Sequence, residues 1–167
     1  MRAFRLWRRS ILALALIVGV GFPSCGKREA SVRIFEISGT PAKRAAKVEA
    51  FLLKHAPALP GPISDAWLFE EQTGDGTLGP SGFSLFAAFT VPIRDLEKWT
   101  ATLAPLESHN QPVSFSSPGK TPCSWWFQAS DLNLLKFYSP HSLTGRNHGW
   151  IAVDERTGRI FLHAFTM

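Results

Sequence analysis

The sequence predicts an α+β fold, in which a mostly antiparallel sheet carries two helices packed on one of its faces. Segments with the alternating pattern of β-strands follow one another along the C-terminal half, and two segments show the spacing of amphipathic helices. Consecutive strands favour antiparallel pairing, because parallel neighbours need a crossover connection. No internal repeat or long linker divides residues 32–167, so one domain is expected there.

The first elements are a strand and a helix. Residues 31–37 alternate between apolar and polar side chains, which is typical of a strand. Thr40 and Pro41 then offer an N-cap followed by proline at the first helical position. The alanine- and lysine-rich run that follows is expected to be helical to about His55, where a group of prolines ends it. Its apolar stripe would be Val48, Phe51 and Leu52.

Two longer strands and a second helix follow. Residues 64–72 and 82–91 are predicted as strands, and a Gly/Asp/Pro-rich stretch joins them. Residues 92–103 return to helical spacing, with an apolar side formed by Ile93, Leu96, Trp99 and Leu103.

The rest of the chain is predicted to form short strands at 113–116, 125–129, 134–138, 150–154 and 159–166. The last two form a hairpin, in which Gly158 supplies a positive φ. A register that pairs Val153 with Ile160 places Trp150 opposite His163. Asp154 is expected to face Arg159 across the same hairpin.

Neighbouring tryptophans occur in one of these predicted strands. Trp125 and Trp126 would point to opposite faces of a strand, so at least one of them would leave the main core. Such a side chain packs beneath a helix or loop, or forms a platform for a sugar, a peptide or a protein partner.

The N-terminus has the pattern of a signal peptide. Four arginines precede an uninterrupted apolar stretch over residues 11–22. This stretch is shorter than the roughly 20 residues that span a bilayer, and it fits the length of a signal-peptide core. Residues 1–24 are therefore expected to direct export and to be removed.

Phe22, Ser24, Cys25 and Gly26 resemble a bacterial lipoprotein signal, although Pro23 departs from that pattern. The resemblance implies an acyl chain such as palmitate on Cys25, and a tether over residues 25–31. It places the chain in the cell envelope, on the periplasmic face of a membrane. The outer membrane is favoured where one exists, because Gly26 replaces the aspartate of inner-membrane retention.

Two alternatives concern export. An ordinary signal peptidase could cut after Gly26 and discard Cys25, which would yield a soluble secreted domain. The pair Arg8-Arg9 resembles a twin-arginine signal, so the general secretory route and the twin-arginine route both remain open.

The charge of the domain argues against nucleic-acid binding. The whole chain carries a net charge of +5, but four of its 18 basic residues lie in the predicted signal peptide. The remaining 14 face 13 acidic residues, so the domain is nearly neutral. Its densest basic cluster, formed by Lys43, Arg44 and Lys47 on the first helix, is interpreted as a solvated face.

The sequence predicts no cofactor and no metal. No phosphate-binding or dinucleotide-binding loop occurs, and the histidines and cysteines lack the local pairing of zinc sites. If Cys25 carries lipid, Cys123 has no cysteine with which to form an intramolecular disulfide.

The polar loop between the strands near residues 138 and 150 is the favoured site. An arginine there could clamp an anion, and its histidines could exchange protons near neutral pH. The alternatives are an ordinary solvated loop and, for the histidine of the terminal hairpin, a packed side chain bonded to a backbone carbonyl. The candidate ligand-binding residues are Tyr138, His141, Arg146, His148, Trp150 and His163.

These observations favour a non-enzymatic envelope domain that binds a small ligand or a protein partner, and no catalytic residue is assigned. One alternative is a small hydrolase that uses a histidine of the 138–150 loop or of the terminal hairpin. Another is a structural or inhibitory lipoprotein.

Overall fold

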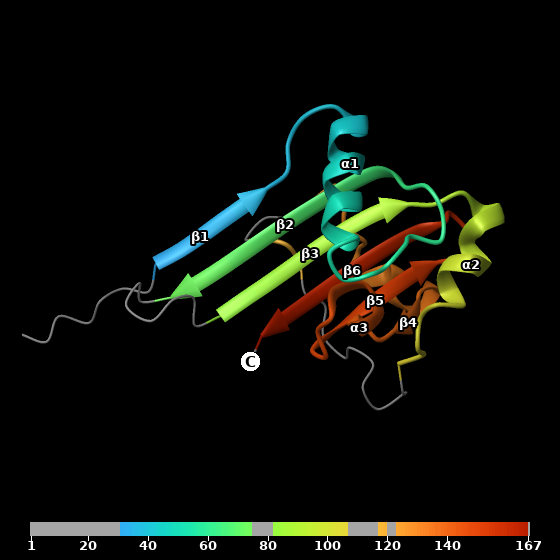
Figure 1. The fold of residues 1–167 in the computed structure, drawn as a ribbon. Coiled ribbons are helices and arrows are strands. Elements are labelled where there is room, and N and C mark those ends of the chain that lie inside the picture. Colours follow the sequence, from blue (N-terminus) through green and yellow to red (C-terminus); the bar gives the residue numbers. More distant parts are fainter. Residues whose placement is uncertain (1–30, 75–81, 107–116, 120–122, 167) are drawn as a thin grey trace, which may run out of the picture.

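The computed structural model of the chain describes residues 31–74, 82–106, 117–119 and 123–166. Six strands form one antiparallel sheet in the order β1-β2-β3-β6-β5-β4 (Figure 1). The fold is therefore α+β and mostly sheet, as the sequence predicts. The strands are β1 (Ser31–Glu36), β2 (Ser64–Gly74), β3 (Gly82–Thr90), β4 (Lys136–Tyr138), β5 (Gly149–Asp154) and β6 (Arg159–Thr166).

The helices are short. The predicted cap begins α1 (Pro41–Leu52), because the Lys43 amide donates a hydrogen bond to Thr40 Oγ1 at 3.4 Å. The predicted second helix is divided into the 3₁₀ turn η1 (Ile93–Asp95) and α2 (Leu96–Thr100), and it ends before residue 103. Two further elements are the 3₁₀ helix η3 (Ala129–Leu134) and α3 (His141–Thr144).

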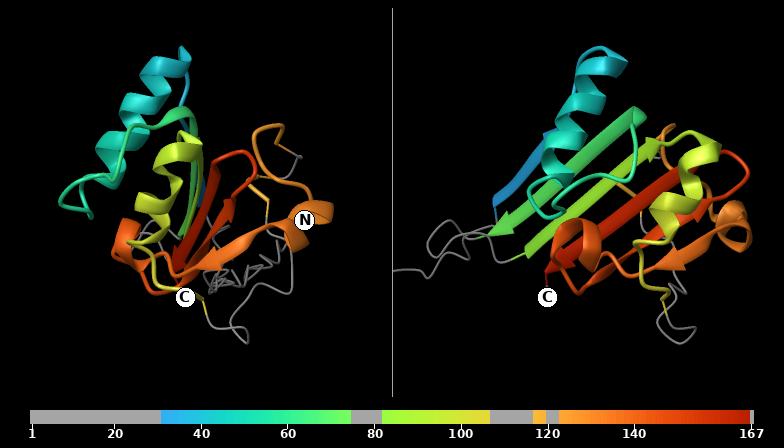
Figure 2. Two further views of the ribbon diagram at one scale, coloured as in Figure 1. Left: turned by 90° about the vertical axis from the view of Figure 1, so that its right-hand side faces the viewer. Right: turned by 45° about the vertical axis from the view of Figure 1, so that its right-hand side comes forward.

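One face of the sheet, which we call the helix face, carries α1 and α2 (Figure 2). Val48 and Leu52 of α1 are fully buried against it, as is Trp99 of α2. The strands contribute alternate apolar residues to this core, including Leu85, Ala87, Phe89, Ile151, Val153, Ile160 and Leu162.

The opposite face, which we call the aromatic face, is partly covered by residues 123–135 (Figure 2). The predicted strand at 125–129 is wrong: these residues form turns that lead into η3. Trp125 and Trp126 consequently do not point to opposite faces of a strand, and both are buried on the aromatic face. This second core includes Phe69, Phe86, Phe127, Trp150 and Phe161.

The C-terminal hairpin has the predicted register. Val153 pairs with Ile160, Trp150 pairs with His163, and Gly158 has a φ of 69°. Asp154 also lies opposite Arg159, but its carboxylate pairs with Arg156 at 3.0 Å instead. The predicted strand at 113–116 lies outside the described residues.

Candidate functional site

The residues of the predicted 138–150 site lie on both faces of the sheet. Tyr138 is half-buried and packs against the core of the helix face, while His141 is exposed at the start of α3. Trp150, in contrast, is buried on the aromatic face. The loop therefore does not gather all six predicted residues into one site.

His163 lies at the centre of the aromatic face. Strand pairing places it between Phe86 on β3 and Trp150 on β5. Its ring stacks on Phe86 with 4.3 Å between centroids and 10° between planes, and it meets Trp150 edge-on at 5.5 Å. Only 7 % of the residue is exposed, so the imidazole is part of an aromatic stack.

Gly149 makes this arrangement possible. Its φ is +124°, and a Cβ atom built on it would lie 2.0 Å from the His163 carbonyl oxygen. Only glycine lets β5 approach β6 so closely at this point, because any side chain would overlap the backbone.

A pocket of about 370 Å³ opens beside His163, and we call it the His163 pocket. Strand pairing places Glu71 of β2 opposite Ser84 of β3, and Ser84 opposite Phe165 of β6. Aromatic rings and polar side chains therefore meet in the same cavity. The lining residues are Glu71, Thr73, Gly82, Phe83, Ser84, Phe86, Ser117, His163, Phe165 and Thr166.

The imidazole of His163 is electrically neutral at pH 7. Burial lowers its pKa from 6.5 to about 4, because the charged form loses its hydration. Its Nδ1 atom is buried and has no hydrogen-bond partner among the described residues. The predicted alternative of a histidine bonded to a backbone carbonyl is therefore not observed at Nδ1.

Besides Trp150, two residues of the predicted loop contact residues that line this pocket without lining it themselves. The guanidinium of Arg146 lies over the Phe83 ring, 4.0 Å from its centroid. The exposed His148 has its ring 6.0 Å from that of Phe165. Four of the six predicted residues are thus found in or next to one cavity, because His163 lines it while Arg146, His148 and Trp150 each contact a lining residue.

Sequence reasoning missed the polar residues that β2 and β3 contribute. Glu71 and Ser84 line the same pocket as His163 only because β3 pairs with β2 on one side and with β6 on the other. The one available signal was the alternation of β2, which places Glu70 and Glu71 on opposite faces.

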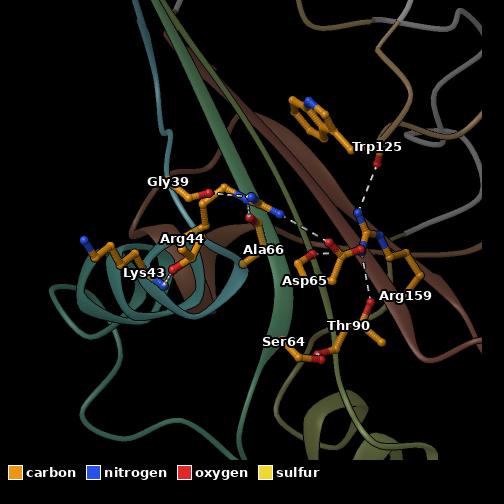
Figure 3. Close-up of polar contacts among 10 residues, drawn as sticks. Gly39, Lys43, Arg44, Ser64, Asp65, Ala66, Thr90, Trp125 and Arg159 are labelled. Carbon is orange, nitrogen blue, oxygen red and sulfur yellow. Dashed lines mark hydrogen bonds and ion pairs between the residues drawn. The ribbon is translucent and has the colours of Figure 1, made fainter.

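A polar network occupies the opposite end of the aromatic face (Figure 3). Arg159 Nη1 donates to Asp65 Oδ2 at 2.6 Å and to Thr90 Oγ1 at 2.9 Å, and Nη2 donates to the Trp125 carbonyl at 3.2 Å. Asp65 lies at an irregularity of β2 and has a φ of 37°, which is unusual for a residue other than glycine. The network therefore holds Asp65 in an unfavourable backbone conformation, next to the residues 123–135 that cover part of the aromatic face.

Arg44 joins this network from α1, which corrects its interpretation as part of a solvated face. Its side chain is buried and donates to the carbonyls of Ala66 at 3.0 Å and Gly39 at 2.8 Å. Residues 64–67 of β2 have no partner in β1, and the Arg44 guanidinium donates a hydrogen bond at this unpaired edge. Its guanidinium also lies 3.8 Å from the centre of the Trp67 ring.

The described residues hold no arrangement typical of a hydrolase or a metal centre. No described histidine side chain is hydrogen-bonded to a serine, a cysteine or a carboxylate. No group of three potential metal ligands occurs among these residues. The Cys123 thiol donates to the Pro118 carbonyl at 3.4 Å, and burial raises its pKa, which makes it a poorer nucleophile.

Comparison of the chain with models of protein families, with curated proteins and with solved structures finds no match. Within the described part of the chain, no helix has the length and apolar character needed to cross a membrane. The site must therefore be interpreted from its own geometry.

Proposed function

We propose that the chain is a non-enzymatic binding domain of the cell envelope, built as a single α+β domain, that takes up a small ligand in the His163 pocket. The observation that carries this proposal is that His163, whose buried Nδ1 has no hydrogen-bond partner among the described residues, lines a cavity. Buried polar atoms normally have partners, and one that lacks a partner needs a physical reason. A ligand that binds in the pocket and rearranges its lining could provide a hydrogen-bond partner for this atom, which would be such a reason.

The lining residues favour a small planar ligand that carries an amine or a hydroxyl group. The rings of His163, Phe86 and Phe165 offer aromatic surface, and a volume of about 370 Å³ suits a small molecule. The Glu71 carboxylate and the Ser84 hydroxyl provide acceptors across the pocket. Since the imidazole is neutral at pH 7, Glu71 is the one acidic or basic side chain that charges the pocket among its described lining residues, and a carboxylate there favours a cation.

Binding is favoured over hydrolysis because of the state of His163. A base with a pKa of about 4 takes protons poorly at neutral pH, and no described serine hydroxyl is bonded to it. A structural or inhibitory role would involve a protein partner, and this pocket is better suited in size to a small molecule.

Glu71 and Glu70 provide a matched pair of variants for the test. Tyramine and benzylamine serve as cationic probes, and 4-hydroxyphenylacetate serves as an anionic one. In NMR titrations, the amines should shift the resonances of His163 and Phe165. Glu71→Gln should weaken amine binding at least about tenfold, because hydrogen bonds to charged groups contribute about 1.5–3 kcal/mol.

Glu70→Gln is the control, because Glu70 points to the helix face and bonds to the Gln72 side chain. It should leave amine binding unchanged. Equal weakening by both substitutions, or no shift of pocket resonances with any of the three probes, would contradict the proposed site.

The proposed tether is an acyl chain on Cys25, joined to β1 through residues 25–31, with the domain in the envelope and the outer membrane favoured where one exists. Labelling with a palmitate analogue should mark the chain, and Cys25→Ser should abolish the label. A mature N-terminus at Lys27 would instead establish the soluble secreted form. The intact mass of the purified protein distinguishes the two.

A further inference from the structure

The two edges of the sheet differ in how they are protected. At the β4 edge, Pro105 forms a bridge with Tyr138, and the Leu106 and Ser139 amides donate to carbonyls of the neighbouring segment at 3.0 and 2.8 Å. At the other edge, no strand of the described chain pairs with the outer side of β1 (Figure 1). An unprotected edge strand is a template for pairing with another chain.

The backbone of β1 presents a regular set of free groups at this edge. The Ile37 amide donates to the Leu68 carbonyl of β2 at 3.0 Å, which makes residue 37 a hydrogen-bonded position of the ladder between β1 and β2. Such positions alternate along an antiparallel pair, so Arg33 and Phe35 also point their backbone groups toward β2. The N–H and C=O groups of Val32, Ile34 and Glu36 consequently point outward.

Three of the six β1 side chains are large, apolar and exposed, and they lie on both faces of the sheet. Val32 is 54 % exposed and Ile34 is 63 % exposed on the aromatic face, and Phe35 is 56 % exposed on the helix face. These three belong to the six large apolar side chains that are exposed among the described residues. Residues 31–36 contain no lysine or proline, and their two charged residues, Arg33 and Glu36, have opposite signs, so the strand carries no net charge that would repel a second copy.

We propose that β1 pairs with β1 of a second copy of this chain, antiparallel and across a two-fold axis at Ile34, to form one continuous sheet. This inference is independent of the ligand proposed for the His163 pocket. Copies related by a two-fold axis bring the same surface together, so the strand must be complementary to itself.

The side chains of β1 select this register. An axis at Ile34 packs Ile34 against its own counterpart, and sets Arg33 beside the ring of Phe35 from the second copy. An axis at Arg33 would instead place two guanidinium groups opposite each other. An axis at Phe35 would shorten the overlap, because β1 ends at Glu36.

The same register uses the free backbone groups. With the axis at Ile34, this residue forms a hydrogen-bonded pair with itself, and Val32 pairs with Glu36 of the second copy. These are the residues whose backbone groups point outward, and they give about six intermolecular hydrogen bonds. An interface of one strand pair lies at the low end of the usual sizes, so we expect a concentration-dependent dimer.

Disulfide trapping tests the register directly. Cα atoms of a hydrogen-bonded pair lie about 5.5 Å apart, which suits a disulfide, so Ile34→Cys should cross-link two copies at the axis. Arg33→Cys is the control, because its counterpart would lie diagonally at about 7–8 Å. Both are made in the full-length chain with Cys123→Ser, and the parent without an added cysteine reports any cross-link through Cys25.

We expect Ile34→Cys to form the homodimer at least tenfold faster than Arg33→Cys. Equal rates for the two variants, or cross-linking of Ile34→Cys only to a different protein, would overturn the proposal.

Ile34→Pro provides a second, independent measurement. It removes an outward N–H and leaves the donors toward β2 in place, and proline is tolerated at such edge positions. The mass of the full-length chain in detergent, measured by sedimentation, should rise with concentration toward that of a dimer, and Ile34→Pro should stay monomeric. A wild-type chain that remains monomeric at every concentration would also overturn the proposal. If Ile34→Pro fails to fold, the two cysteine variants decide.

Discussion

Replacing His163 by phenylalanine should remove much of the acid sensitivity of the fold. In the folded protein, burial lowers the pKa of His163 to about 4, whereas the unfolded chain has the ordinary value of 6.5. Above pH 6.5 the imidazole is neutral in both states, and the folded state bears no penalty. As the pH falls from 6.5 toward 4, only the unfolded chain gains the proton, and stability is lost.

The size of the effect follows from the two pKa values. Between pH 7.5 and pH 5.0, the preferential protonation of the unfolded chain costs about 2 kcal/mol, and the limit at lower pH is about 3 kcal/mol. Phenylalanine removes this titration and keeps the stacking on Phe86 and Trp150. Its own effect at pH 7.5 should be small, since similar volumes usually exchange for less than about 1.5 kcal/mol.

Urea unfolding at pH 7.5 and 5.0 measures the difference. Asp154 has a lowered pKa because Arg156 donates hydrogen bonds to it, so its contribution to stability is lost only as the pH falls below about 4, outside this interval. Wild type should lose about 2 kcal/mol more than His163→Phe between the two pH values.

His148→Phe is the matched control, because His148 is exposed and its replacement should leave the pH dependence unchanged. A His163→Phe variant that loses as much free energy of unfolding as wild type would refute the assignment of acid sensitivity to this burial. An equal effect of both substitutions would refute it as well.

Other substitutions test the packing by urea unfolding. Gly149→Ala should cost about 3 kcal/mol because its Cβ would lie 2.0 Å from the facing backbone. Gly119→Ala, with its nearest neighbour at 3.7 Å, should cost only about 1–2 kcal/mol for its positive φ. Arg159→Ala should cost about 2–4 kcal/mol through its lost bonds, whereas Lys136→Ala, in an exposed ion pair, should leave the free energy of unfolding nearly unchanged. Trp126→Ala should cost about 3–5 kcal/mol by leaving a cavity. A smaller loss for Gly149→Ala than for Gly119→Ala, or for Arg159→Ala than for Lys136→Ala, would contradict these readings.

Local signals in the sequence predicted the elements whose structure depends on local chemistry. The cap at Thr40 depends on a hydroxyl near an amide three residues later, and the β5–β6 hairpin depends on Gly158 and on alternation. Both predictions were confirmed. The segment at 125–129 failed because its aromatic residues resemble a strand in composition, while their packing on the sheet is set by contacts with β3, β5 and β6.

The candidate site was predictable only in part, for the same reason. The register of one hairpin was enough to place Trp150 opposite His163. The positions of Glu71 and Ser84 depend on the pairing of β3 with β6, two strands far apart in sequence. Arg44 was misread because a cation on a helix is usually solvated, and only the short β1 leaves carbonyls of β2 in need of its donors.

The position of the His163 pocket follows from how the cover of the aromatic face is fixed. Residues 123–135 cover part of the aromatic face, and we call them the cover. At the end of the sheet where Thr90 pairs with both Ser64 and Arg159, Arg159 donates a hydrogen bond to the Trp125 carbonyl, which holds the cover there. From there the cover reaches Phe86 through Trp126, with 5.5 Å between ring centroids. The strand positions beyond Phe86, toward Gly82, form the pocket. Asp65 therefore acts from the end of the sheet opposite the pocket, because its carboxylate accepts a hydrogen bond from the Arg159 guanidinium that also donates to the Trp125 carbonyl.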